Sequence, residues 1–186
     1  VIARISTRRV VRSRGLVRFG LDRARERGLH AEYVDPGRFR TRLDEVSEPA
    51  YVRFLQQADV DLICLAGFMR ILKSGFLDAF PQSVINIHPS LLPSFGGRGL
   101  YGSRVHQAVL DHGCKVSGCT VHFVDPQYDN GPIILQRTCP VFETDDASTL
   151  AARVFAEETI AYPEAIRLYQ KGRLRLQGRK VHVAAE

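Results

Sequence analysis

The sequence lacks the features that mark membrane, secreted and disulfide-rich proteins. No apolar stretch approaches the roughly 20 residues of a transmembrane helix, and no signal-peptide pattern is recognisable. The four cysteines, at positions 64, 114, 119 and 139, form no C-x-x-C pair. We therefore predict reduced thiols in a cytoplasmic protein that has no disulfide framework, no metal site and no membrane partner.

Positive charge is concentrated at the start of the chain. The formal net charge is +6, and residues 1–40 hold 11 Arg against 4 Asp or Glu, a net of +7, so residues 41–186 carry −1. The arginine-rich run at 8–18 is compatible with a nucleic-acid-binding arm, a solvated helix face or a divergent terminus. Because Phe19 is the only aromatic residue beside this run, we expect no nucleic-acid partner.

Short apolar runs alternate with amphipathic segments along the whole sequence. This alternation is typical of an α/β fold with a mostly parallel central sheet and helices on both faces. We predict a single domain over residues 1–186, in which Asp146 or Ser148 caps the longest helix. The predicted helices span 15–28, 48–58, 74–80, 103–113 and 146–171, and the predicted strands span 1–6, 30–34, 60–67, 84–88, 115–125 and 132–142, with a terminal hairpin at 173–183.

The strand VINIH at 84–88 ends on two polar side chains. Side chains alternate between the faces of a strand, so Asn86 and His88 share a face, and Pro89 then stops the ladder. Strand ends of this kind are where open α/β sheets bind their ligands. Asp129, in the turn PQYDNG between two later strands, is a candidate carboxylate partner for the histidine.

Together these three groups would suit the addition of a nucleophile to a carbonyl. A carboxylate favours the charged imidazolium, which transfers protons, and an asparagine amide donates to an oxygen that becomes negative. The structural alternative is that His88 is a hydrogen-bonded strand-end residue and Asp129 an ordinary turn residue. His122, in TVHFV, is a further candidate or a core residue.

Several motifs in one order resemble the glycinamide ribonucleotide formyltransferases, which are folate-dependent enzymes of purine synthesis. The matching runs between Val60 and Pro163 are DLICLAGFMRIL, VINIHPSLLPSF, VSGCTVHFV, DNGPIILQ and AYP. The resemblance implies a Rossmann-like formyltransferase fold. It also implies transfer of a formyl group from 10-formyltetrahydrofolate, a cosubstrate, to the amine of glycinamide ribonucleotide, without a metal.

The resemblance assigns roles to individual residues. The family's catalytic asparagine, histidine and aspartate fall on Asn86, His88 and Asp129. In that family the amine attacks the formyl carbon, so Asn86 and charged His88 would stabilise the oxyanion while Asp129 helps to move protons. The implied binding residues are Met69, Arg70, Ile71, Leu72, Asn86 and Val124 for folate, and Glu158 for the nucleotide.

The start of the chain departs from the family pattern. Members normally begin with an apolar strand and a glycine-serine-asparagine loop that holds the nucleotide's phosphate, whereas VIARIS at 1–6 matches their second strand. The chain begins at Val1, so we expect a form shortened at its N-terminus. One hypothesis is that Arg8, Arg9 and Arg12 supply phosphate contacts instead.

Three other functions compete with this interpretation. Formyltetrahydrofolate deformylase uses the same chemistry with water as acceptor but has a preceding regulatory domain, and methionyl-tRNA formyltransferase has a following RNA-binding domain. A noncatalytic folate-binding remnant would keep the fold without turnover. We expect small-molecule substrates and a monomer or homodimer.

Overall fold

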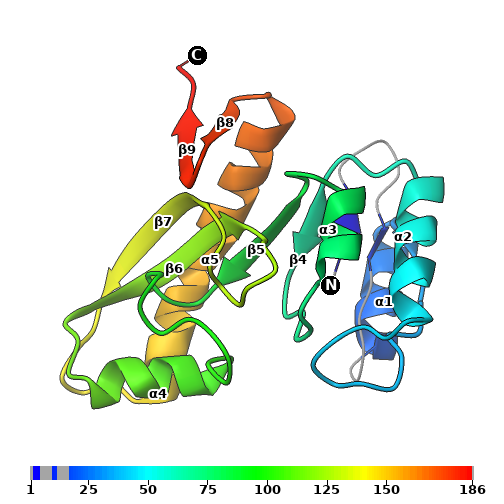
Figure 1. The fold of residues 1–186 in the computed structure, drawn as a ribbon. Coiled ribbons are helices and arrows are strands. Elements are labelled where there is room, and N and C mark those ends of the chain that lie inside the picture. The colour runs from blue at the N-terminus through cyan, green and yellow to red at the C-terminus, as the bar shows by residue number, and fades with distance from the viewer. Residues whose placement is uncertain (1, 5–9, 12–16, 186) are drawn as a thin grey trace. The chain divides into compact units, whose positions relative to one another are not determined.

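The computed structural model describes residues 2–4, 10–11 and 17–185, and side chains from Leu21 onward. Arg8, Arg9, Arg12 and most of the arginine-rich run lie outside the described residues. The helices are α1 Val17–Glu26, α2 Ser47–Gln57, α3 Ser74–Ala79, α4 Ser103–Asp111 and α5 Ala147–Gln170 (Figure 1). The strands are β1 Ile2–Arg4, β2 Val10–Val11, β3 His30–Ala31, β4 Ile63–Leu65, β5 Val84–His88, β6 Val116–Phe123, β7 Ile133–Pro140, β8 Leu174–Gln177 and β9 Lys180–Val183.

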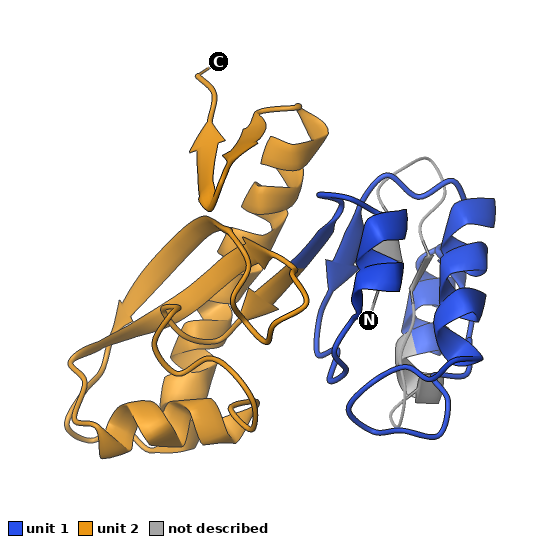
Figure 2. Cartoon of the chain, viewed as in Figure 1, with its two compact units in different colours: residues 1–85 blue, residues 86–186 orange. Residues whose placement is uncertain are grey.

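The chain divides into two compact units, residues 1–85 and residues 86–186 (Figure 2). β5 crosses this division, so that Val84 and Ile85 belong to the first unit and Asn86 to His88 belong to the second. The single domain over 1–186 stays a prediction.

The first unit is built on short strands and on the buried faces of α1, α2 and α3. β1 pairs antiparallel with β4, and β2 pairs parallel with β3. In α2 the buried residues are Ser47, Tyr51 and Leu55, a spacing of four that places them on one helix face. All three residues of β4 are buried, as are Leu72 and Phe76. This core supports the segment between β4 and α3.

The second unit is built on a long antiparallel pair covered by α5. β6 pairs with β7 over most of its length, with Val121 opposite Leu135 and a register shift between Val121 and His122. α5 contacts both strands and also α4 (Figure 1). Its buried residues are Leu150, Val154, Ala161 and Ala165. β8 and β9 form the hairpin expected at the end of the chain.

The strand pairings whose direction the structure describes are of both kinds, so the strand pairing is mixed. β1–β4, β6–β7 and β8–β9 are antiparallel, and β2–β3 is parallel. β6 and β7 are antiparallel because the connection between them, residues 124–132, contains no helix. Parallel strands need a longer crossover, whereas a short loop returns the chain in the opposite direction.

All four cysteines are in the thiol form, and Cys64, Cys119 and Cys139 are buried. Burial raises the pKa of the Cys119 thiol to about 12, so this side chain is uncharged and unreactive at neutral pH. The buried thiols therefore pack as small apolar residues. In the parts of the chain that the structure describes, no helix combines the length and the apolar character needed to span a bilayer.

Candidate active site

Asn86 and His88 lie at the carboxyl end of β5, which begins with apolar residues. Val84 and Ile85 are fully buried at the start of the strand, and His88 at its end is 5% exposed. The apolar residues of the strand are buried in the core, which fixes the backbone that carries the polar residues at its carboxyl end. The strand has the predicted bounds, 84–88, and the catalytic role of Asn86 and His88 stays a prediction.

Both ring nitrogens of His88 face acceptors. Nδ1 lies 3.5 Å from Asp129 Oδ1, and Nε2 lies 2.9 Å from the backbone oxygen of Phe95. A carbonyl oxygen can only accept, so Nε2 is the donor of that bond. A second proton on Nδ1 would face the carboxylate, so the charged imidazolium is fully accommodated. The contact between His88 and Asp129 that the sequence suggested is therefore present.

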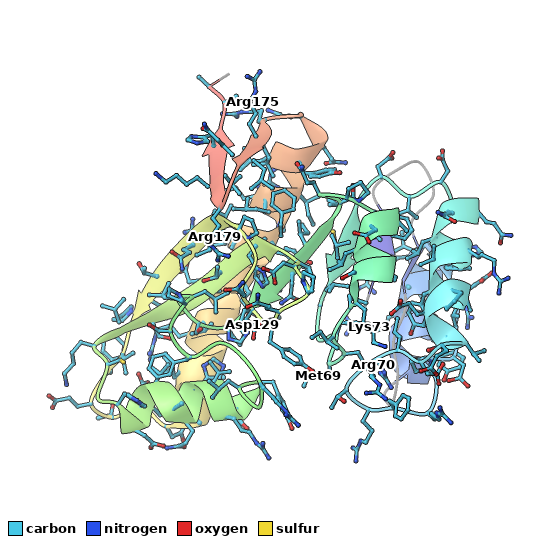
Figure 3. The ribbon with its side chains drawn as sticks, in the orientation of Figure 1. Met69, Arg70, Lys73, Asp129, Arg175 and Arg179 are labelled. Carbon is cyan, nitrogen blue, oxygen red and sulfur yellow. The ribbon has the colours of Figure 1, made fainter. Side chains whose placement is uncertain are left out.

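Asp129 lies on the connection between β6 and β7 (Figure 3) and divides its oxygens between two partners. The backbone N–H of Gly97 donates to Oδ2 at 2.9 Å, while Oδ1 faces His88. Its φ of +50° is in the left-handed region, which few residues other than glycine, asparagine and aspartate adopt readily. The turn thus holds the carboxylate in a fixed direction.

The segment from Ser90 to Gly97 is anchored to β6 and β7 by side chains that the sequence analysis did not select. The Thr120 hydroxyl donates to Ser90 O at 2.7 Å and accepts from Leu92 N–H at 2.9 Å. It also accepts from Gln136 Nε2 at 2.9 Å, and the same amide nitrogen donates to Leu92 O at 3.0 Å. Thr120 is fully buried, so its hydroxyl uses one donor and two acceptor positions.

Close packing completes this anchor at Gly96. A β-carbon at this position would lie 2.5 Å from Leu92 Cδ2 and 3.1 Å from Asp129 Cβ. The glycine therefore lets the segment approach the aspartate closely enough for Gly97 to donate its N–H. Strand alternation alone does not indicate Thr120, because the register shift between Val121 and His122 interrupts it.

Two more buried histidines occupy this unit. His122 Nε2 is 3.3 Å from Asn86 Nδ2, and its Nδ1 is 2.8 Å from Phe123 O. His106, on α4, has an Nδ1 without a hydrogen-bond partner in the described part of the chain. Burial is the main cause that lowers the pKa of both histidines, and the nearby charge of His88 lowers each further.

The predicted folate residues Met69, Arg70, Ile71 and Leu72 follow β4 in the first unit (Figure 3). Arg70 Nε donates to Phe39 O at 3.1 Å, and Ile71 N–H donates to Thr41 O at 2.9 Å, so the residues 39–42 run alongside this segment. Leu72 is buried, whereas Met69 is 48% exposed and available for an apolar contact.

The remaining predicted residues, Val124 and Glu158, lie in the second unit. Val124 directly follows β6 and is half-buried, and Glu158 is half-buried on α5. Burial raises the pKa of the Glu158 carboxyl. Within the described residues no three His, Cys, Asp or Glu side chains are grouped as a metal site requires, and the absence of a metal stays a prediction.

The comparisons with known proteins agree on one family. The profile described as formyl transferase matches residues 8–166. The chain is 41% identical over 147 residues to the chloroplastic phosphoribosylglycinamide formyltransferase of Arabidopsis thaliana, covering 79% of this chain and 50% of the relative. It is 48% identical over 112 residues to the chloroplastic protein of the same name from Vigna unguiculata, covering 60% of this chain and 36% of the relative. The chain thus spans half or less of these curated relatives.

Solved structures support the same relationship over more of the chain. Glycinamide ribonucleotide transformylase 1 from Symbiobacterium toebii superposes with a TM-score of 0.84 at 45% identity, covering 95% of this chain and 80% of the other. A formyltetrahydrofolate deformylase from Pseudomonas syringae, at 24% identity and a TM-score of 0.81, shares the fold alone. The α/β formyltransferase fold is therefore present, and the chain belongs to the formyl transferase family.

Proposed function

We propose that this protein transfers the formyl group of 10-formyltetrahydrofolate to the amine of glycinamide ribonucleotide, a step of purine biosynthesis. The observation that carries the proposal is the pairing of His88 with Asp129, with Asn86 on the same strand end, in a chain of this family. The names of the relatives support the choice of acceptor, since those at 36% to 48% identity are transferases that act on this nucleotide.

The chemistry follows from the three side chains. The amine nitrogen attacks the formyl carbon, and the carbonyl electrons move to the oxygen, which becomes negative. The Asn86 amide donates to that oxygen, and the charged His88 joins it when its Nε2 N–H turns from Phe95 O to the substrate, so that both donors lower the barrier. The intermediate collapses by breaking the bond to N10 of the folate. One proton leaves the attacking amine and one arrives at N10, and we assign this transfer to His88 and Asp129.

We assign substrate binding to residues that come before, within and after β5 in the sequence. Met69, Arg70, Ile71, Leu72, Asn86 and Val124 are proposed to hold the folate, and Glu158 is proposed to contact the nucleotide. A largely apolar segment with a few polar groups suits a flat ring such as the pterin. We further propose a largely parallel central sheet with helices on both faces, as the α/β pattern favours. The cytoplasmic location and the monomeric or homodimeric state stay predictions.

The test measures tetrahydrofolate release by absorbance. Purified protein is mixed with 10-formyltetrahydrofolate, with and without glycinamide ribonucleotide. Release that depends on the nucleotide supports the proposal, and it should be lost in Asn86→Ala and His88→Ala variants. Release without the nucleotide would instead identify a hydrolase. Folate binding without release would identify a noncatalytic remnant.

A further inference from the structure

His122 is the buried histidine in contact with Asn86, and the proposed reaction does not use it. Its side chain is on β6, and the residue is 2% exposed. One ring nitrogen, Nδ1, is 2.8 Å from Phe123 O, and the other, Nε2, is 3.3 Å from the Asn86 amide nitrogen. Each nitrogen therefore has one partner of known chemical character.

These partners determine which nitrogen carries the proton. Phe123 O is a carbonyl oxygen and can only accept, so Nδ1 must be protonated to make that bond. In a neutral imidazole Nε2 then has a lone pair and accepts from the Asn86 amide. One N–H of Asn86 is thereby used, and the other N–H of the same amide group is fixed in direction.

We infer that His122 is a positioning residue whose neutral imidazole, protonated on Nδ1, orients the Asn86 amide so that its second N–H is directed at the reacting formyl oxygen. Only the direction of the second N–H toward the formyl oxygen rests on the proposed function. His122 itself touches no reacting atom and acts through Asn86.

The charges around His122 act on its pKa in both directions, and burial has the largest effect. Asp129 and Asp125 favour the charged imidazolium, as does the bond to Phe123 O, whereas His88 opposes it. Burial is the largest effect and lowers the pKa of His122. His122, which faces an amide N–H, is therefore expected to be uncharged.

Protonation of His122 would have a specific structural consequence. With both ring nitrogens as donors, an N–H on Nε2 would face the N–H₂ of Asn86. The amide would then have to turn over and present its oxygen to His122, and the donor would leave its place. A neutral His122 is thus a condition for the orientation of Asn86.

The first test reads the tautomer and does not depend on activity. In the ¹⁵N-histidine-labelled protein at pH 7, long-range ¹H–¹⁵N spectra should give His122 a protonated Nδ1 and an unprotonated Nε2. The signals are assigned by their loss in His122→Gln, with exposed His182→Asn as a matched control. A protonated Nε2, in a neutral or charged ring, would overturn the inference.

The second test uses two replacements that each keep one end of the imidazole. Glutamine reaches the position of Nε2 and can accept from Asn86, whereas asparagine reaches the position of Nδ1 and keeps only the bond to Phe123 O. We expect His122→Asn to lower kcat about 10²-fold, the effect of a misplaced group, with KM for folate little changed. His122→Gln should restore most of kcat. Equal kcat in the two variants would contradict the positioning role.

A double-mutant cycle separates positioning from a general structural effect. Because His122 acts through Asn86, adding His122→Asn to Asn86→Ala should cause no further loss of kcat. Losses that multiply would overturn the inference. If the unchanged protein shows no nucleotide-dependent release, the proposed function fails, while the tautomer measurement still decides whether His122 holds Asn86.

Discussion

Asp129 divides its two carboxylate oxygens between a backbone N–H and a histidine. The N–H of Gly97 fixes one oxygen, so the other stays directed at His88. Two features determine the direction of the Asp129 carboxylate. One is the left-handed backbone conformation of Asp129, and the other is the close approach of the segment 90–97 at Gly96.

Asp129→Asn should keep the shape of this arrangement and remove its charge. The asparagine oxygen can still accept from Gly97, but an amide no longer stabilises a charged His88. We expect kcat to fall about 10²- to 10⁴-fold, the usual contribution of acid–base catalysis, with folate binding nearly unchanged. Steady-state kinetics and folate titration check this, with exposed Asp111→Asn as the control. Normal turnover in Asp129→Asn would remove this residue from the mechanism.

Thr120→Val tests the anchor under the segment 90–97. Valine matches threonine in shape but has no hydroxyl, so Ser90 O and the Leu92 N–H lose a buried partner. We expect the free energy of unfolding to fall by about 1–3 kcal/mol and kcat to fall as well. Urea unfolding and kinetics are the measurements, with the exposed Thr138→Val on β7 as the matched control. If Thr120→Val leaves both the free energy of unfolding and kcat unchanged, the anchor is dispensable.

At the scale of elements, α5 begins at a well-defined cap. The Asp146 side chain accepts from the backbone N–H groups of Ser148 and Thr149, and the Thr149 hydroxyl pairs with the Asp146 N–H. The sequence left Asp146 and Ser148 as alternative caps, and the structure selects Asp146. Arg153, about two turns into the helix, donates to Asp145 through two short bonds, so the turn before α5 is also fixed.

Asp146→Ala should therefore weaken the second unit. Removal of a capping side chain leaves helix N–H groups without an acceptor. We expect the melting temperature to fall by about 2–4 °C, the change typical of a lost cap in a chain of this length. Ser148→Ala is the matched control, since the Ser148 side chain makes no cap bond. Equal melting temperatures for the two variants would contradict the assignment.

At the scale of the whole molecule, acid should destabilise the protein in two steps. The first involves His106 and His122, whose folded pKa lies below the ordinary value of 6.5 because they are buried. The unfolded chain binds their protons first, so stability is lost as pH falls below about 6.5. The second involves Asp44, Asp145 and Asp146, whose pKa is lowered from 3.8 by hydrogen bonds, so their contribution is lost as pH falls below about 4.

Glu158 works in the opposite direction. Burial raises the pKa of its carboxyl, so its charged form costs stability as pH rises through that value. The melting temperature should still decrease overall from pH 8 to pH 3. The two histidines and three aspartates lose stability on acidification, whereas Glu158 alone gains it. Asp145→Asn should flatten the lower step and leave the upper one. A melting temperature that rises on acidification would refute this assignment.

Local sequence patterns determined much of what was found. The apolar pattern predicted the strand at 84–88, and residue periodicity predicted helices α1 to α5 to within a few residues of their ends. The family could be recognised because its motifs are short and keep their order. These features depend on neighbours in the chain, which a sequence displays directly.

Only the tertiary structure decided the pairings across the chain. The bonds of Thr120 to the segment after β5, the contact of Asn86 with His122 and the approach of Asp129 to His88 each join residues about 30 to 40 positions apart. Such pairs depend on strand register and on the angle of a turn, and a one-residue shift would send each side chain to the other face. For this reason the sequence identified the candidate catalytic residues, and the fold determined which partners orient them.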